Sequence, residues 1–339
     1  MRVSSFPIFS SLEEACACVG IEPRESRRHF TTTNTEGRGK HGRGAGRILA
    51  FPDGKGGMCF NWQTGHAALF YYGYGGARPN RKEIARMRSE LRQQRSEYER
   101  QTNDRQRAVA ALAAQIFGAA AGAGGEHAYL RRKGLQMVPA WGGLRCIRAD
   151  IAQALIDGVG IQQDDGLGQR LNVSGRLLVV PLTDADGVLW SVQLIDEGGR
   201  KVFLKGGRKK GLLWCPEGAL FNVGGAEAIG VAEGVATAMS VTLLYSVPCV
   251  AAIDAGNLMA AAESVRKRFP NYEVAFYADR DKSGVGEEKA REAALMMQGR
   301  GARCRVYLPP FTAEQDAAFE EATGKQPTDF NDYWGIWSK

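Results

Sequence analysis

Three carboxylates in the C-terminal part of the sequence follow short apolar runs. Glu233 comes directly after the run 228–232, and Asp279 and Asp281 come after the run 274–278. Such a run, followed by Gly and a helical pattern, is typical of a buried parallel strand that leads into a helix. Ligands bind at the carboxyl ends of the strands of an open α/β sheet. The spacing therefore predicts that Glu233, Asp279 and Asp281 meet at one sheet edge.

Clustered carboxylates repel one another, and a bound cation offsets that repulsion. Residues two apart on an extended segment point to the same side, so Asp279 and Asp281 can face one ion. All of these donors are oxygens, with no His or Cys near them in sequence, which favours Mg²⁺ or Mn²⁺ over Zn²⁺. The alternative is a helix-capping or surface role, but carboxylates at strand ends with Gly after two of them favour a metal site.

The arrangement resembles the Toprim domain, which is shared by bacterial-type primases, topoisomerases and some nucleases. That domain has Glu-Gly after its first strand and Asp-x-Asp-x-x-Gly after a later one, and the matching residues are Glu233, Gly234, Asp279, Asp281 and Gly284. The resemblance implies that Glu233, Asp279 and Asp281 are catalytic and bind the metal. Replicative primases usually have a further Asp four residues after the Glu, where this sequence has Thr237, so the number of metal ions stays open.

A second acidic segment lies near the end of the sequence, at 328–334 (TDFNDYW). It resembles the Asp-x-Asn-Asp motif at the end of the Toprim domain of many primases. The resemblance implies that Asp329 and Asp332 either bind the metal as additional carboxylates or position the metal ligands without contacting the metal.

A basic run lies just before the Toprim-like block. Between Arg200 and Lys210 there are six basic residues and no acidic one. On a sheet rim beside a carboxylate cluster, this run would hold a phosphate backbone or a nucleoside triphosphate; the alternative is a solvated face. The stretch from Arg176 to Lys210 resembles the N-terminal half of the bacterial-type primase core, in which Arg opens a Pro-containing strand, a turn follows, and a Lys-aromatic-Leu segment precedes a basic loop. The matching positions are Arg176, Pro181, Asp186, Gly187, Lys201, Phe203, Leu204 and Lys210. The nucleic-acid or nucleotide contacts expected on this basis are Arg176, Lys201, Lys205, Arg208, Lys209 and Lys210.

Periodicity and turns predict an α/β protein. Its Toprim-like, doubly wound, mainly parallel sheet is preceded by a small α+β unit and a long helical connector. The expected regions are a small N-terminal α+β region at 1–79, a helical region at 80–170, a β-rich basic subdomain at 171–227 and the Toprim domain at 228–339. A capped helix is expected over 11–19, a small antiparallel sheet over 47–65 and an unbroken helix over 81–117.

Two features of the first half have open roles. Aromatic residues follow the small sheet, where they would form its core or stack on single-stranded bases; they are Phe60, Trp62, Phe70, Tyr71, Tyr72 and Tyr74. The segment 126–135 matches a His-x-Tyr-Leu-x-x-Lys-Gly element of plasmid and phage primases, and we expect His127 to be structural rather than catalytic.

Bulk properties narrow the class of protein further. The chain of 339 residues carries a net charge of +7, which favours a polyanionic partner. Its seven Cys are scattered without Cys-x-x-Cys pairs, so no zinc is expected. We find no signal peptide and no apolar stretch of membrane length, so we expect a soluble, cytoplasmic protein with no membrane partner.

The order of the basic segment and the Toprim-like block favours a DNA primase of the plasmid or phage type. It would synthesise short primers on a single-stranded DNA template from nucleoside triphosphates, with a helicase or other replication protein supplied in trans as a further candidate partner. Two alternatives stay open: a non-catalytic single-stranded DNA-binding protein with a Toprim fold, and a metal-dependent Toprim nuclease.

Overall fold

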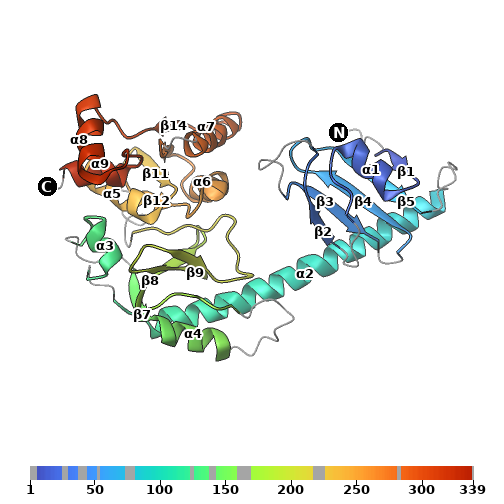
Figure 1. Cartoon of the computed structure of the whole chain (residues 1–339), viewed down its shortest axis with the longest axis horizontal. Helices are drawn as coiled ribbons and strands as arrows, with labels where there is room; N and C mark the ends of the chain where they lie inside the picture. The colour runs from blue at the N-terminus through green and yellow to red at the C-terminus, as the bar shows by residue number, and fades with distance from the viewer. Residues whose placement is uncertain are drawn as a thin grey trace. The chain divides into compact units, whose positions relative to one another are not determined.

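The computed structural model describes residues 6–24, 30–36, 44–51, 54–72, 81–122, 126–136, 143–158, 169–216, 226–280 and 284–337 (Figure 1). The chain divides into two compact units, Met1–Arg95 and Ser96–Lys339, and each is described by itself. One helix, α2 (Arg81–Ala119), begins in the first unit and ends in the second. The expectation of an unbroken helix from residue 81 is thus confirmed, and the helix ends three residues before Gly122.

The first unit is a five-stranded sheet with one helix packed on it. The strand order is β1-β5-β4-β3-β2, antiparallel except for the pair β1 and β5. Helix α1 (Leu12–Val19) packs on β4 and β5, and Ser11 caps it by accepting the N–H of Glu14 at 3.2 Å. The expected capped helix and small sheet are therefore confirmed. The strands are β1 (Ile8–Phe9), β2 (Phe30–Thr33), β3 (Gly46–Ala50), β4 (Gly56–Asn61) and β5 (Ala67–Tyr71).

The aromatic residues of this unit divide between core and surface. Phe70 is buried, whereas the side chains of Trp62 and Tyr72 are 65% and 56% exposed. The ring of Phe60 meets that of Trp62 edge-on, with 4.7 Å between ring centroids. Tyr74 lies outside the described residues. The described aromatic residues therefore do not all belong to the core of this unit.

The second unit contains an antiparallel sheet of order β10-β9-β8-β7-β6. The turn between β8 and β9 is closed by Asp184, whose Oδ1 accepts the N–H groups of Asp186 and Val188, both at 3.0 Å. Gly187 in this turn has φ of 84°, a left-handed conformation that glycine adopts readily. The strands are β6 (Ala121–Gly122), β7 (Arg145–Arg148), β8 (Arg176–Thr183), β9 (Leu189–Asp196) and β10 (Lys201–Phe203).

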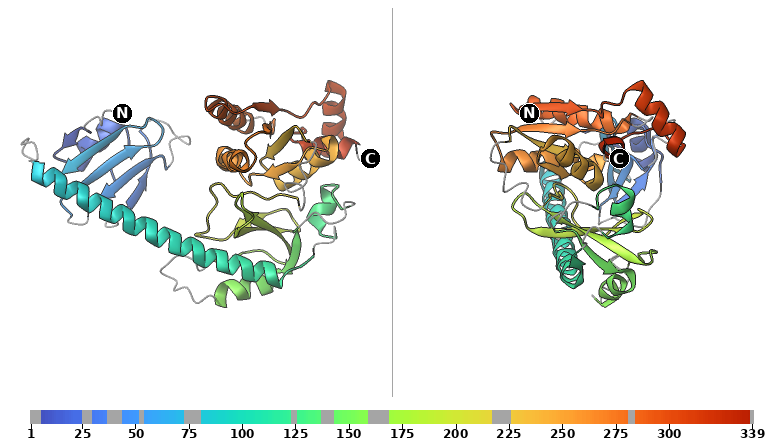
Figure 2. Two further views of the ribbon diagram at one scale, coloured as in Figure 1. Left: turned by 180° about the vertical axis from the view of Figure 1, so that it is seen from behind. Right: turned by 90° about the vertical axis from the view of Figure 1, so that its left-hand side faces the viewer.

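The two faces of this antiparallel sheet are covered by different elements. One face packs against the C-terminal part of α2 and against α4 (Ala149–Gly158), with Val109, Ile116 and Ala152 in the shared core. The other face packs toward the parallel sheet, in a core that includes Leu178, Ile195 and residues of α5. Figure 2 shows the antiparallel sheet between these two layers.

The parallel sheet has the order β12-β11-β13-β14, and all of its strand pairs are parallel. Helix α5 covers one face, and α6 and α7 cover the other. Helices on both faces of a parallel sheet define a doubly wound architecture, so the expected fold class is confirmed. The elements are β11 (Ala228–Ala232), α5 (Val235–Tyr245), β12 (Cys249–Ala251), α6 (Leu258–Arg268), β13 (Glu273–Tyr277), α7 (Val285–Gln298) and β14 (Cys304–Tyr307).

A short segment, 211–214, joins the two sheets of the second unit. Leu213 pairs with Thr183 at the end of β8, and Trp214 pairs with Ala251 of β12. The buried side chain of Asn257 holds the start of this segment. Its Oδ1 accepts the Gly211 N–H, and its Nδ2 donates to the carbonyls of Leu212 and Ala252, each at 2.8 Å. Hydrogen bonds thus run without interruption from the antiparallel sheet to the parallel one.

The C-terminal helix α9 (Phe330–Trp337) contacts the His-x-Tyr-Leu-x-x-Lys-Gly element. Asn331 Nδ2 donates to the Lys133 carbonyl at 2.8 Å, and Trp334 Nε1 donates to the Gly134 carbonyl at 3.0 Å. His127 is fully buried at the start of α3 (Ala128–Arg132), where its Nδ1 accepts the Tyr129 N–H. Its Nε2 lies 3.1 Å from the Arg176 carbonyl and donates to it. These contacts support the expected structural role of His127.

The protonation of His127 predicts a pH dependence of stability. Burial disfavours the imidazolium and lowers the pKa of His127 below its ordinary 6.5. The unfolded chain therefore takes up a proton near pH 6.5 while the folded chain does not. We expect the free energy of unfolding to fall as the pH drops below about 6.5, and this component to vanish in His127→Asn. Urea unfolding of both proteins between about pH 7.5 and about pH 5.5, one unit on each side of that pKa, measures the difference. Parallel pH profiles would contradict the assignment.

Candidate active site

The carboxyl ends of three neighbouring strands bring acidic residues to one edge of the parallel sheet. Ala232, the last residue of β11, is in register with Tyr277 of β13 and with Ala251 of β12. Glu233 follows Ala232 directly, and Asp279 lies two residues beyond Tyr277. The two carboxylates therefore follow adjacent parallel strands, with Glu233 one residue and Asp279 two residues beyond the paired Ala232 and Tyr277.

Close packing fixes the position of Asp279. One of its carboxylate oxygens is buried, and its backbone lies against the first turn of α7. A Cβ on Gly286 of α7 would lie 3.3 Å from the Asp279 carbonyl oxygen, which is tighter than an ordinary contact. Gly284 starts α7 with φ of 69°, a left-handed conformation that glycine adopts readily. The Gly of the Asp-x-Asp-x-x-Gly pattern thus has a backbone role.

Asp281 lies outside the described residues, so its place at this edge stays a prediction. Across the described ranges, no three His, Cys, Asp or Glu side chains form a group that could hold a metal ion. The metal role of Glu233, Asp279, Asp329 and Asp332 therefore also remains a prediction.

Asp329 and Asp332 organise the start of α9. Asp329 Oδ1 accepts the Asp332 N–H at 2.8 Å, and Asp332 Oδ2 accepts the Thr328 N–H at 2.8 Å. Burial and the neighbouring Asp332 charge raise the pKa of Asp329 above its ordinary value. Both carboxylates thus have capping roles in addition to any role at a metal.

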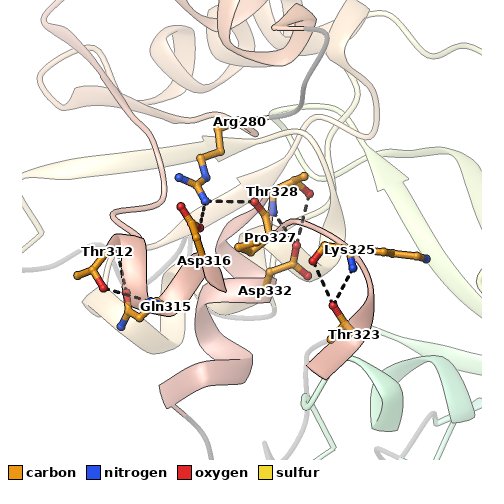
Figure 3. Close-up of polar contacts among 9 residues, drawn as sticks. All are labelled: Arg280, Thr312, Gln315, Asp316, Thr323, Lys325, Pro327, Thr328 and Asp332. Atoms are coloured by element: carbon orange, nitrogen blue, oxygen red, sulfur yellow. Dashed lines mark hydrogen bonds and ion pairs between the residues drawn. The ribbon is translucent and has the colours of Figure 1, made fainter. Parts of the chain in front are cut away.

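The segment after Asp279 is attached to this cap. The Arg280 N–H donates to the Thr328 carbonyl at 2.8 Å, and the Arg280 guanidinium binds the Asp316 carboxylate and lies 4.5 Å from the centroid of the Phe311 ring. Figure 3 shows Arg280 between Asp316 and the segment that leads to Asp332. Asp316 belongs to α8 (Ala313–Thr323), a helix that begins with a capping box at Thr312. The C-terminal helices therefore hold the backbone next to Asp279 in place.

Lys201 is one of two predicted basic residues that the fold places near the carboxylate edge. An ideal Cβ built on Gly234 would lie 3.8 Å from Lys201 Nζ. Gly234 has φ of −107°, which any residue can adopt, so its lack of a side chain mainly leaves space beside Lys201. The ammonium group therefore lies next to the Glu233–Gly234 turn, and its role as a template or nucleotide contact remains a prediction.

The other predicted basic residues are distributed along the loop that follows β10. Lys205 is exposed, and Lys210 lines a surface groove. Lys209 Nζ lies 3.7 Å from the centroid of the Phe203 ring and 3.8 Å from the Asp254 carboxylate. Arg176 lies apart from this loop, at the start of β8, where its carbonyl binds His127. The structure thus brings Lys201 and Lys209 to the sheet edge and leaves Arg176 on the antiparallel sheet.

Arg208 is held by an aromatic partner. Its guanidinium carbon lies 5.0 Å from the centroid of the Trp190 ring, and its Nε donates to the Lys210 carbonyl. Trp190 is oriented in turn by a 2.8 Å hydrogen bond from Nε1 to Asp184 Oδ2. This hydrogen bond and those from the turn N–H groups favour the carboxylate and lower the pKa of Asp184, although burial opposes them.

The turn after β12 contains site residues that the sequence did not single out. Asp254 follows β12 at the same sheet edge as Glu233 and pairs with Lys209. Ile253 has φ of 78°, a strained conformation for a β-branched side chain. Such strain persists where surrounding contacts impose it, and the three hydrogen bonds of Asn257 supply those contacts here. The partners of this turn, Lys209 and Gly211, lie about 45 residues away in the sequence, so no local pattern indicated these contacts.

The donor set at this edge suits a hard divalent cation. The segments 232–237, 252–257 and 278–280 contain carboxylate, hydroxyl and amide oxygens but no His or Cys. Oxygen ligands are those that Mg²⁺ and Mn²⁺ prefer. Glu233 and Asp279 are the described residues that would hold such an ion.

Comparison with known families assigns the parallel-sheet region. The family model described as the Toprim domain matches residues 228–337, which contain β11 to β14 and helices α5 to α9. The sequence motifs indicated a resemblance to Toprim-domain proteins, and this match confirms it. The match to the Toprim domain supports the binding of a divalent cation but does not identify which ion is bound.

Two curated relatives share sequence with about half of this chain. Both are Escherichia coli proteins named DNA primase TraC. One is 32% identical over 182 residues, which is 50% of this chain and 17% of the relative; the other is 34% identical over 148 residues, 42% of this chain and 10% of the relative. The chain thus spans less than a fifth of the length of either relative. These matches confirm the resemblance to primases of the plasmid type.

Solved structures that match parts of this chain include primase domains. The RNA polymerase domain of Mycobacterium tuberculosis primase DnaG matches with a TM-score of 0.42 and 16% identity, covering 70% of this chain and 87% of that domain. A DnaG catalytic domain bound to single-stranded DNA matches with a TM-score of 0.45 and 14% identity, covering 67% and 82%. The Escherichia coli primase catalytic core matches with a TM-score of 0.43 and 15% identity, covering 66% of this chain and 80% of that core.

The helices bear on the expectation that the protein has no membrane partner. Among the described residues, no helix is both long enough and apolar enough to cross a bilayer.

Proposed function

We propose that this protein is a template-dependent DNA primase that makes short primers on single-stranded DNA by metal-dependent nucleotidyl transfer. The observation that carries the proposal is the meeting of Glu233 and Asp279 at adjacent strand ends, with Lys201 of the basic segment beside Gly234. The sequence similarity to two DNA primases supports it.

In the proposed reaction, the 3′-hydroxyl oxygen of one nucleotide attacks the α-phosphorus of the next. A new P–O bond forms, the bond to the β-phosphate oxygen breaks, and pyrophosphate leaves with its charge. Lys201 contacts a phosphate of the incoming nucleotide or the template, since its ammonium lies beside the edge. Glu233 accepts the hydroxyl proton or completes a metal site.

Asp279, with Asp281 after it, is proposed to hold Mg²⁺ or Mn²⁺ rather than Zn²⁺. The ion, when bound, stabilises the negative charge of the attacking and leaving oxygens. Asp329 and Asp332 are proposed to position the metal ligand Asp279. Their hydrogen bonds fix the Thr328 segment, and the Thr328 carbonyl accepts the N–H of Arg280, the residue after Asp279. Lys205, Arg208, Lys209, Lys210 and Arg176 are proposed to contact the template or the triphosphates.

Incorporation of labelled nucleotides on single-stranded DNA tests this function. We expect short products that require a template, a divalent cation and nucleoside triphosphates, and that disappear when a chelator removes the cation. Ribo- and deoxynucleotides are supplied in separate reactions, and a replicative helicase is added in a further arm. Degradation of labelled DNA without synthesis would instead support the nuclease alternative. Tight binding without either reaction in any arm would support the non-catalytic alternative.

A further inference from the structure

The residue after the candidate metal ligand, Arg280, contacts three separate segments of the C-terminal region. Its guanidinium binds the Asp316 carboxylate on α8 and lies 4.5 Å from the centroid of the Phe311 ring, in the segment before that helix. Its backbone N–H donates to the Thr328 carbonyl at 2.8 Å, and its Nη2 donates to the Pro327 carbonyl at 3.4 Å. One arginine therefore joins the segments that precede, form and follow α8 (Figure 3).

Core packing does not explain why α8 lies against Arg280. None of the residues of α8 is buried, and the helix contains acidic residues and no basic one. The side chains of the ion pair are themselves partly exposed, 29% for Arg280 and 36% for Asp316. Ion pairs that water reaches contribute little to the stability of a fold. The contact is therefore better explained by the segment that it holds in place.

The contacts of Arg280 affect the direction in which Asp279 points. The hydrogen bonding of β13 continues beyond its last residue, since the Ala278 N–H donates to the Tyr307 carbonyl at 3.0 Å. Consecutive residues of an extended segment point to opposite sides. Because the Arg280 side chain is fixed on α8, the Asp279 side chain points the other way, toward the start of α7, where one of its oxygens is buried. The same alternation would place Asp281, outside the described residues, on the side of Asp279.

The chemistry of arginine suits this position. Its planar guanidinium binds a carboxylate and stacks on an aromatic face at the same time, whereas a lysine ammonium is a point charge without a fixed plane. The Phe311 ring is held in turn by Tyr333 of α9, which meets it edge-on with 5.2 Å between ring centroids. A positive charge beside a bound cation is unfavourable. The Asp316 carboxylate therefore also offsets the charge that Arg280 brings to the metal site.

We propose that Arg280, held by Asp316, is a positioning residue for the divalent cation: it fixes the segment that carries Asp279 and thereby sets the affinity for the ion. The proposal rests on the metal role of Asp279 in the proposed function. Residues that orient metal ligands without touching the metal contribute roughly 10- to 100-fold to metal affinity. The proposal also gives a function to α8, which presents Asp316 without adding to the core.

Direct measurement of Mn²⁺ binding tests this role independently of catalysis. Electron paramagnetic resonance distinguishes free from bound Mn²⁺, so titration of the full chain without DNA or nucleotides gives the dissociation constant. We expect Arg280→Gln and Asp316→Asn each to weaken Mn²⁺ binding by about 10-fold. Because both variants break the same contact, the double variant should also bind about 10-fold more weakly, rather than about 100-fold as independent effects would give.

The sign of the Arg280→Gln effect separates positioning from charge. Removal of a positive charge near a cation site should strengthen Mn²⁺ binding by Coulomb's law, whereas loss of positioning should weaken it. Glu320→Gln removes an exposed negative charge one turn after Asp316 on the same helix and should leave the dissociation constant nearly unchanged. Asp316→Glu keeps the carboxylate and should restore most of the affinity. All of these variants should melt at the wild-type temperature, because the pair is partly exposed.

The alternative is that the ion pair only attaches α8 to the domain. Arg280→Gln and Asp316→Asn would then expose α8 to proteolysis without changing the dissociation constant, and the positioning role would be rejected. Tighter binding by Arg280→Gln would reject it as well. Wild-type binding no stronger than that of Asp279→Asn would reject the metal site and the positioning role with it. Mn²⁺ binding that responds as expected, without primer synthesis under any condition, would keep the positioning role and reject the primase.

Discussion

Asp279→Asn is expected to abolish most nucleotide incorporation while leaving single-stranded DNA binding intact. The substitution preserves the shape of a side chain that is packed against α7 and has one buried oxygen, but removes its negative charge. An amide offers an oxygen but no negative charge, so it holds a divalent cation more weakly than a carboxylate does. We expect the turnover number to fall on the order of 10²–10³-fold, the range observed when a group that stabilises transition-state charge is lost.

A matched control separates this effect from a general change of charge. Asp150 is an exposed carboxylate on α4 that pairs with Arg148, so Asp150→Asn makes the same chemical change away from the edge. It should incorporate nucleotides at the wild-type rate. Both variants should unfold at the wild-type temperature. If Asp279→Asn retained full turnover at saturating metal, Asp279 would not be part of the catalytic site.

The sequence was sufficient to predict the parallel sheet and the placement of its acidic edge. Each strand is a short apolar run with Gly or a turn at its end, and such local patterns are visible in one dimension. The adjacency of β11 and β13 then follows from the doubly wound order, which brings Glu233 and Asp279 to the same edge.

Contacts between distant segments could not be predicted in this way. Lys209 meets Asp254, and Gly211 meets Asn257, across about 45 residues, and nothing local to either segment indicates the other. Helix α8 was not predicted because it has no buried residue and so lacks an apolar stripe. Its capping box, Thr312 with Gln315, was the available signal.

The division into four regions also remains a prediction. The expected helical region, 80–170, contributes β7 to the same sheet as β8 of the expected basic subdomain. The cores likewise cross the expected boundary at 228, because Leu178 and Ile195 share a cluster with Ala236 and Met239. Apolar patterns identify strands but do not specify which strands share a sheet.

Asn257→Asp is expected to destabilise the second unit strongly. The side chain is buried, and its Nδ2 donates to two carbonyls, those of Leu212 and Ala252. Aspartate would leave both carbonyls without a donor and place a negative charge beside them. We expect the free energy of unfolding to fall by about 3–5 kcal/mol, from two lost hydrogen bonds to buried groups and from the repulsion.

An opposing effect is too small to cancel this loss. Asn257 is the N-cap of α6, and a negative charge there interacts favourably with the helix dipole by about 0.3–1 kcal/mol. The net change should lower the melting temperature by about 10 °C, measured by calorimetry. Asn271→Asp, at an exposed position in the turn before β13, makes the same substitution without these partners and should be nearly neutral.

The pH dependence of the variant gives a more specific test of the same contact. Burial and the two carbonyls should raise the pKa of an aspartate at position 257, so that the folded state binds a proton more tightly than the unfolded state. A protonated carboxyl group can donate one hydrogen bond. The deficit relative to wild type should therefore shrink as the pH falls toward 5, about one unit above the ordinary aspartate pKa. A deficit that is constant with pH would show that Asn257 does not join the segment 211–212 to the parallel sheet through these hydrogen bonds.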